Sequence, residues 1–437
     1  MALIDPTLID PTLIDPTVVA SVEAMARRAR AAGRELALAS RAMKDQALLG
    51  MADALMENSD AVVRENLFDL ELGAQRGLSA GLLDRLTLSP ERIVGIVEAV
   101  RELAALADPV GAVVRGSTLP NGLRLRQVRV PMGVVGMVYE ARPNVTVDAA
   151  GLGLKSGNAV ILRGGSAAER TNRAIIGVLR DAVAGAGLPA DAIQTIDQFG
   201  RDGVRALMRA RGLVDLLVPR GGAELIQTVV REAQVPVIET GVGNCHVYVD
   251  GAANLDQAVR IVINSKVQRP SVCNAAETLL VDRAVAAEFL PRVLGELADL
   301  GVKFHVDAAA QALVPAGAQW EAARAVDWDT EYLDLELAVA VVDGLEGGVA
   351  HIQRHSSGHT EAICTQDLGR AQEFTDRIDS AVVMVNASTR FTDGGQFGLG
   401  AEIGISTQKL HARGPMGLAE LTSTKWICVG NGQVREA

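Results

Sequence analysis

Short apolar segments alternate with helical segments from about residue 134 to residue 385, and this alternation most constrains the fold. An apolar run of about four to six residues suits a strand buried on both faces. The helical segment after each run can cross back to a parallel neighbour. The pattern therefore predicts an α/β protein with parallel sheets. The predicted strands are Val134–Tyr139, Ala159–Leu162, Val214–Val218 and Val235–Ile238, and then Val247–Val249, Leu279–Val281, Val302–Val306, Ala338–Val342, Ala362–Thr365 and Val382–Val385.

The strands fall into two consecutive sets, which predict two α/β domains. The chain has 437 residues, enough for two or three domains with large buried cores. Ligands of such proteins usually bind in a cleft at the carboxyl ends of the strands. We therefore expect a ligand site between the two domains.

The region before the first strand set has three parts. Residues 3–17 are three copies of Leu-Ile-Asp-Pro-Thr, too short and too rich in proline for a repeat architecture, and we expect them to be poorly ordered. From about Val18 to Ala107 the apolar spacing predicts helices. Asn121-Gly122, followed by alternating apolar residues, then predicts a β-hairpin. Its arginines are interpreted either as a solvated strand face or as a subunit contact.

Charge and composition exclude several classes of protein. The formal net charge is −11, which argues against a nucleic-acid surface. No uninterrupted apolar run is long enough to span a membrane, and the N-terminus lacks the pattern of a signal peptide. The four cysteines form no CxxC pair, which is typical of a reducing compartment. We expect a cytoplasmic protein.

Two glycine-rich segments and a histidine cluster are candidate ligand sites. Gly151–Gly157 has the wrong spacing for a dinucleotide loop, and Gly157 is interpreted as a helix-terminating residue. Gly221 and Gly222 separate a strand from a helix, so their N–H groups either face an anion or form a tight turn. His351, His355 and His359 have helical spacing, but Ser356–Gly358 would break the helix, and we predict no metal site.

The four cysteines differ in their sequence context. Cys364 and Cys428 lie in apolar strand patterns and are predicted to be inert core thiols. Cys245 adjoins His246, but neighbours on a strand face opposite sides, which argues against a Cys-His pair. Cys273 lies in a polar turn, Gln268–Asn274, where nearby cations or N–H donors would favour a thiolate. Cys273 is therefore the candidate nucleophile.

The chain resembles the γ-glutamyl phosphate reductases, also called glutamate-5-semialdehyde dehydrogenases, of the aldehyde dehydrogenase superfamily. The resemblance covers most of the chain from about residue 125 to residue 427, and the matching segments are long. They are Arg129–Asp148, Ala159–Gly165, Gln268–Asn274, Val385–Glu402 and Ser406–Leu418.

The resemblance implies that NADPH reduces L-glutamyl 5-phosphate to glutamate 5-semialdehyde and phosphate, a step of proline biosynthesis. It places Cys273 at the family's nucleophile and Asn144 at the asparagine that stabilises the oxyanion. The residue types suit this chemistry, because a thiolate converts an acyl phosphate to a thioester through an oxyanion that N–H groups stabilise. Without the resemblance, Asn144 would be interpreted as a turn residue after Pro143.

The resemblance also implies nucleotide contacts. Arg163 stands where oxidising relatives have a lysine that binds the adenosine ribose, and Ser166 replaces a frequent glutamate. A 2′-phosphate would meet no repulsion from Ser166 and would pair with Arg163, which favours NADP over NAD. Otherwise Arg163 is an exposed residue after a strand. Glu331 aligns with a residue that binds the nicotinamide ribose.

Several charged residues are assigned less specifically by the resemblance. Glu239 aligns with the glutamate that activates water in aldehyde oxidisers, so it is interpreted as a base or as a structural residue. Glu140, Arg142 and Arg390 are candidates for contacts with the charged end of the substrate, and each is equally interpretable as part of a structural ion pair.

The expected architecture is aldehyde dehydrogenase-like, with two parallel-sheet domains and a β-flap for oligomerisation. We expect a homo-oligomer, and glutamate 5-kinase is a candidate partner. The predicted parts are an extension (1–17), a nucleotide-binding domain (18–112 and 130–238), a catalytic domain (239–412) and the flap (113–129 and 413–437).

Three alternative functions remain at this point. Glu239 favours an NAD-dependent aldehyde oxidiser, which Ser166 opposes. A cysteine hydrolase that pairs Cys273 with a histidine would bind no nucleotide. In a non-catalytic scaffold, Cys273 would be inert toward thiol reagents.

Overall fold

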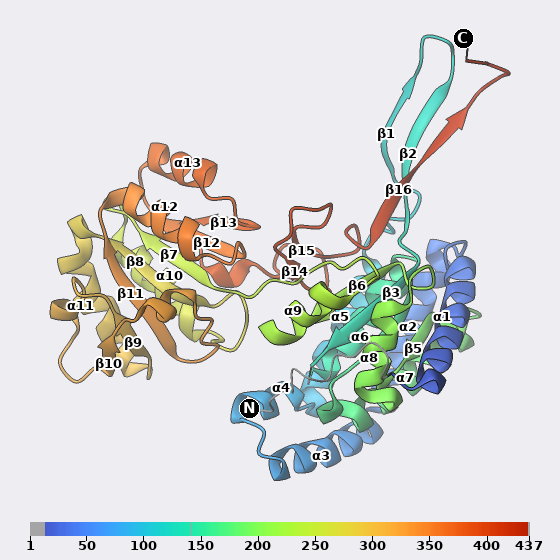
Figure 1. Cartoon of the computed structure of the whole chain (residues 1–437), viewed down its shortest axis with the longest axis horizontal. Helices are drawn as coiled ribbons and strands as arrows, with labels where there is room; N and C mark the ends of the chain where they lie inside the picture. The colour runs from blue at the N-terminus through green and yellow to red at the C-terminus, as the bar shows by residue number, and fades with distance from the viewer. Residues whose placement is uncertain (1–13, 141, 436–437) are drawn as a thin grey trace. The chain divides into compact units, whose positions relative to one another are not determined.

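The computed structural model describes residues 14–140 and 142–435, which form two compact units (Figure 1). The first unit comprises the described residues up to Glu239, together with Leu399–Ile403 and the residues from Met416 onward. The second comprises Thr240–Gly398 and Gly404–Pro415. The chain thus returns to the first unit after it has built the second.

The first unit begins with a set of helices, as the sequence predicts. Asp15, from the third Leu-Ile-Asp-Pro-Thr copy, accepts a hydrogen bond from the N–H of Thr17, and Pro16 occupies the first helical turn, so this copy starts the first helix. The first two copies lie outside the described residues, so the expectation that they are poorly ordered stays a prediction. The helices are α1 (Pro16–Leu36), α2 (Arg41–Glu57), α3 (Ser59–Gln75), α4 (Ala80–Leu86) and α5 (Pro90–Ala105).

A four-stranded parallel sheet forms the centre of the first unit, in the order β5-β4-β3-β6. Val134 and Ile161 pack with α1 on one face, and Val160 packs against Gly153 of α6 on the other, where a Cβ would lie 2.4 Å from its Cγ1. The strands are β3 (Val134–Tyr139), β4 (Ala159–Arg163), β5 (Ile193–Thr195) and β6 (Leu216–Arg220), and the helices are α6 (Pro143–Lys155), α7 (Glu169–Gly185), α8 (Gly200–Arg209) and α9 (Ala223–Glu232).

Two details of this sheet differ from the sequence prediction. Val235–Ile238 is not a strand, because it forms only an isolated bridge between Val237 and Leu217. The edge strand β5 was not predicted, since its three residues are too short to show a pattern. Gly157, with φ +79°, directly follows the C-cap residue of α6, as predicted.

The second unit contains a seven-stranded parallel sheet, in the order β10-β9-β11-β8-β7-β12-β13. Val247 and Leu279 pack with Phe289 on one face, and Tyr248 and Leu280 belong to a separate core cluster on the other. The strands are β7 (Cys245–Val249), β8 (Ala276–Asp282), β9 (Lys303–Val306), β10 (Trp320–Ala322), β11 (Glu336–Val342), β12 (Thr360–Cys364) and β13 (Val382–Val385), and the helices are α10 (Leu255–Val267), α11 (Arg283–Asp299), α12 (Gly344–His355) and α13 (Leu368–Arg377). The predicted α/β class with parallel sheets is confirmed.

The predicted hairpin pairs with a C-terminal strand in a three-stranded antiparallel sheet (Figure 1). The strands are β1 (Val113–Thr118), β2 (Arg124–Pro131) and β16 (Thr422–Val429). β1 is exposed along its whole length, and Arg115 lies 5.0 Å from the ring of the exposed Trp426. Cys428 on β16 is exposed, so the prediction of a core thiol there is wrong.

None of the described helices is long and apolar enough to cross a membrane.

Candidate active site

Cys273 lies in the turn between α10 and β8 of the second unit, and its side chain is partly buried. The N–H of Ala275 donates to the carbonyl of Val272 at 3.0 Å, which closes the turn around the cysteine. Asn274, next in the chain, is buried and donates through Nδ2 to the carbonyl of Thr392 at 2.7 Å. The loop that presents the thiol is therefore anchored on both sides.

A cation, Arg390, interacts with the cysteine. Arg390, in the short helix η7 (Thr389–Phe391), donates through Nε to Gln268 Oε1 at 2.8 Å and interacts electrostatically with Cys273 and Arg269. Burial lowers the pKa of Arg390, while Asp393 opposes the decrease. A cation beside a partly exposed thiol favours the thiolate. The structure thus brings two predicted residues, Cys273 and Arg390, together.

Glu331 contacts the same region through the backbone. Its Oε1 accepts a hydrogen bond from the N–H of Gly243 at 2.7 Å. Gly243 packs directly on the cysteine, since a Cβ there would lie 1.6 Å from the carbonyl oxygen of Cys273. Glu331 was predicted from the resemblance as a contact of the nicotinamide ribose. In the structure it binds the backbone of Gly243, and Gly243 in turn contacts Cys273.

The other cysteines of this unit are buried. Burial raises the pKa of Cys364 to about 12, which agrees with the predicted inert core thiol. Cys245 and His246 point in different directions on β7: His246 Nδ1 lies 3.0 Å from Glu361 Oε2, whereas Cys245 faces the loop of Cys273. The two do not form a pair, as strand geometry predicted.

Asn144 lies in the first turn of α6 in the first unit and is exposed. Its Nδ2 donates to Asp148 Oδ2, four residues later, at 3.3 Å. Burial raises the pKa of Asp148 to about 7; the bond from Asn144 and the charge of Arg220 act in the opposite direction, and Glu402 adds to the increase. Sequence analysis missed Asp148, although the spacing of one helical turn is a visible signal.

Arg163 ends β4, and Ser166 begins the short helix η2 (Ser166–Ala168). Nε of Arg163 is buried and has no hydrogen-bond partner among the described residues, and burial lowers the pKa of its guanidinium. A neighbouring carboxyl group, Asp197, accepts from the N–H of Gly164 at 2.7 Å, and burial raises its pKa to about 6. Sequence analysis considered a carboxylate only at position 166 and missed Asp197.

Gly221 and Gly222 lie between β6 and α9, at the start of the helix. The N–H of Gly222 donates to Glu140 Oε2 at 3.0 Å, and a Cβ at Gly221 would lie 2.8 Å from the carboxyl carbon of Glu140. A carboxylate therefore accepts from one of the N–H groups for which the sequence leaves open an anion contact or a tight turn. Glu140 was a candidate substrate contact, and the structure brings it to Gly221 and Gly222 instead.

Two further candidates of the first unit are Arg142 and Glu239. Arg142 is the N-cap residue of α6. Glu239 is partly buried, and its Oε1 accepts from Gln227 Nε2 at 3.2 Å.

The histidine cluster does not form a continuous helix face. His351 and His355 are on α12, which ends at His355, and His359 follows the break just before β12. Burial lowers the pKa of His351 to about 3, and the nearby His246 and His355 add to the decrease. Within residues 14–140 and 142–435, no group of three His, Cys, Asp or Glu side chains is arranged to hold a metal ion.

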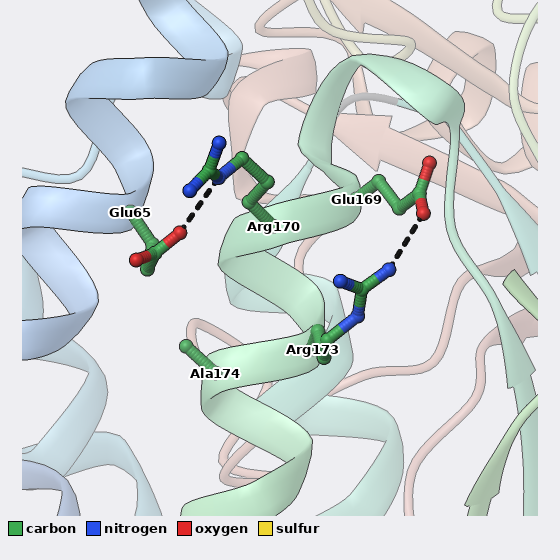
Figure 2. Close-up of a pocket in the computed structure, with 5 residues that line it drawn as sticks. All are labelled: Glu65, Glu169, Arg170, Arg173 and Ala174. Carbon is green, nitrogen blue, oxygen red and sulfur yellow. Dashed lines mark hydrogen bonds and ion pairs between the residues drawn. The ribbon is translucent and has the colours of Figure 1, made fainter. Parts of the chain in front are cut away.

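Figure 2 shows a pocket of the first unit that none of the predicted site residues lines. Arg170 of α7 forms an ion pair at 2.8 Å with Glu65 of α3, and Arg173 forms one at 2.8 Å with Glu169 of its own helix. Both arginines are exposed, so this pocket is a charged surface depression.

Comparisons with known proteins identify the family of this chain. Residues 16–325 match the model of the aldehyde dehydrogenase family. A γ-glutamyl phosphate reductase of Kineococcus radiotolerans is 62% identical over 416 residues, which cover 95% of this chain and 96% of that protein. One of Thermobifida fusca is 58% identical and covers 95% of this chain and 98% of its own.

Solved structures show the same relationship. The γ-glutamyl phosphate reductase of Thermotoga maritima superposes with a TM-score of 0.89 at 44% identity, over 95% of this chain and all of that chain. An acetylating aldehyde dehydrogenase of Geobacillus thermoglucosidasius shares the fold, with a TM-score of 0.71 at 18% identity, over 98% of this chain and all of that chain. The chain therefore belongs to the aldehyde dehydrogenase family and, within it, to the γ-glutamyl phosphate reductases.

Proposed function

We propose that this protein reduces L-glutamyl 5-phosphate to L-glutamate 5-semialdehyde and phosphate with NADPH, in proline biosynthesis, through a thioester on Cys273. The observation that carries the mechanism is the setting of Cys273: a partly buried thiol in an anchored turn, beside Arg390. The names of relatives that are 58% and 62% identical support the substrate.

The proposed chemistry begins with nucleophilic attack. The Cys273 thiolate forms a C–S bond to the acyl carbon, and phosphate leaves with its bonding electron pair. The N–H of Cys273 and, by the family resemblance, the amide of Asn144 donate to the oxyanion; losing one such donor typically costs about 10²–10³ in rate. NADPH, when bound, supplies the hydride that reduces the thioester. The C–S bond then breaks, which releases the aldehyde and regenerates the thiolate.

The nucleotide is held, in this proposal, by the first unit. Arg163 has a buried Nε without a partner among the described residues, and the neighbouring Ser166 carries no charge, so this edge suits the 2′-phosphate of NADP. The N-terminus of α9, at Gly221 and Gly222, suits the diphosphate of the nucleotide. In the structure, the Glu140 carboxylate accepts from the Gly222 N–H that the diphosphate would use. Glu331 is a further proposed cofactor contact.

Substrate contacts and assembly extend the proposal. Arg390 and Arg142 are proposed to bind the charged end of the glutamyl group. We expect a cytoplasmic homo-oligomer that pairs through the flap of β1, β2 and β16, since this sheet exposes Val113, Val114 and Trp426. Glutamate 5-kinase is the proposed partner, because it would supply an unstable acyl phosphate. A monomer in sedimentation at micromolar concentration would contradict the oligomer.

The reverse reaction tests the function. NADPH formation from glutamate 5-semialdehyde, NADP and phosphate is followed by ultraviolet absorbance with the wild-type protein and with Cys273→Ala. We expect a phosphate-dependent signal that falls by roughly 10⁴-fold or more in the variant.

Two other outcomes would contradict the proposal. A signal without phosphate means that water deacylates the thioester, so that Glu239 acts as a base and the enzyme is an aldehyde oxidiser. No signal in either condition removes the proposed activity, while the family and fold remain.

A further inference from the structure

The thiol of Cys245 contacts the backbone of the proposed nucleophile. Cys245 is the first residue of β7, and 0% of its surface is exposed. Its Sγ–H donates a hydrogen bond to the carbonyl oxygen of Cys273, with 3.2 Å between sulfur and oxygen. The two residues are 28 positions apart, so only the tertiary structure makes this contact.

The carbonyl of Cys273 is also confined by Gly243. A Cβ at Gly243 would lie 1.6 Å from that oxygen and 2.6 Å from Cys273 Cα, so backbone packs directly on backbone. Gly243 is itself fixed, because its N–H donates to Glu331 at 2.7 Å and its carbonyl accepts from the N–H of Cys245 at 2.9 Å. The peptide that follows Cys273 is therefore held in one orientation.

The surroundings of Cys245 keep its thiol protonated. Burial first, and then the charges of Glu361 and Cys273, raise the pKa of Cys245 well above its usual value. His359 is a further polar neighbour, and its Nδ1 lies 3.7 Å from the sulfur and 2.8 Å from Thr360 Oγ1. Cys245 is thus an S–H donor at neutral pH rather than a second nucleophile.

We propose that Cys245 is a positioning residue for Cys273, and this inference rests on the nucleophile role proposed above. The Cys245 thiol orients the peptide between Cys273 and Asn274. The bond from Ala275 N–H to the carbonyl of Val272 orients the peptide before Cys273. Because both flanking peptides are fixed, the sulfur and the N–H of Cys273 meet the developing oxyanion without reorganisation.

Two substitutions at Cys245 and one control test this inference in the phosphate-dependent assay. Cys245→Ala removes the donor, and we expect kcat to fall on the order of tenfold, as for the loss of one hydrogen bond, with unchanged KM values. Cys245→Ser restores a donor and should return kcat to within about twofold of wild type. Cys364→Ala, which removes a buried thiol on β12, should lower the thermal midpoint comparably and leave kcat unchanged.

Alkylation of Cys273 by iodoacetamide, read by mass spectrometry of the labelled peptide, supplies a further readout. Its pH profile should stay the same in Cys245→Ala, because a positioning role changes the geometry of the transition state and not the charge of the thiol. The exposed Cys428 provides an internal reference for labelling.

A wild-type kcat in Cys245→Ala, or a Cys245→Ser enzyme as slow as Cys245→Ala, would overturn the positioning role. Cys273→Ala separates this failure from failure of the proposed function. If Cys273→Ala keeps its activity, the nucleophile assignment itself is wrong, and the role of Cys245 fails with it.

Discussion

The two units support their candidate site residues by different physical means. In the second unit, Cys273 is held by contacts within its own unit: the Asn274 side chain donates to the carbonyl of Thr392, and Gly243 and the Cys245 thiol confine the carbonyl of Cys273. In the first unit, the candidates are surrounded by partly desolvated charged groups, among them Asp148 and Asp197 with raised pKa values. The comparison teaches that the proposed nucleophile is positioned before ligand arrives, whereas the candidate sites of the first unit keep charged groups that a ligand can neutralise or satisfy.

Asn144→Ala is expected to have the largest effect, because it removes the proposed oxyanion donor of the first unit. We expect kcat to fall by about 10²–10³, as for the loss of an oxyanion donor, while Cys273 is still alkylated at the wild-type rate. Steady-state kinetics measures kcat, and iodoacetamide labelling measures the alkylation rate of Cys273. Asn58→Ala, at the N-cap of α3, is the matched control and should leave kcat unchanged. An unaffected kcat in Asn144→Ala would show that this amide has no role in the reaction.

Arg163→Ala tests the proposed contact with the 2′-phosphate in the first unit. We expect the KM for NADPH to rise about 10–100-fold, as for the loss of a charge-assisted hydrogen bond, and the KM for NADH to change little. The matched control is Arg173→Ala, an exposed arginine of α7 that pairs with Glu169. Equal effects on both nucleotides would contradict a contact with the 2′-phosphate.

Asp148→Asn has the smallest expected effect, and it appears in stability. Because the pKa of Asp148 is raised to about 7, the folded protein keeps this proton at pH values where the unfolded chain has lost it. The free energy of unfolding should therefore fall as pH rises from about 4 to about 7, and the variant should lack this decrease. Urea unfolding at several pH values measures it, with the exposed Asp181→Asn as control. Parallel pH profiles for wild type and Asp148→Asn would contradict the raised pKa.

Most strands of both sheets were predictable because parallel strands are buried on both faces and appear as apolar runs. Ala159–Leu162 and Ala338–Val342 match β4 and β11 within two residues. The prediction fails where an apolar run forms no strand, or where a strand is too short to appear as a run. Val235–Ile238 is apolar but forms one bridge and no ladder, and the three-residue strands β5 and β10 are too short to show a pattern. Cys428 was misjudged because apolar neighbours on the flap do not indicate burial.

The candidate site was only partly predictable. Cys273 stood out because a polar turn between a helix and a strand is unusual for a core thiol, and Asp148 had a local signal at one helical turn from Asn144. Asp197 beside Arg163 and Glu140 at Gly222 had none, since each pair comes from separate strands and loops. The resemblance supplied the roles that local patterns could not.

By itself, the sequence determined the fold class, the family and the residue most suited to be the nucleophile, because these depend on local periodicity and on long matching segments. Only the tertiary structure decided what surrounds that residue. The contacts of Cys273 with Gly243 and Cys245, and the approach of Arg390, join parts of the chain that lie far apart in sequence. Hydrogen-bond geometry and desolvation depend on those distances in space, which no spacing along the chain specifies.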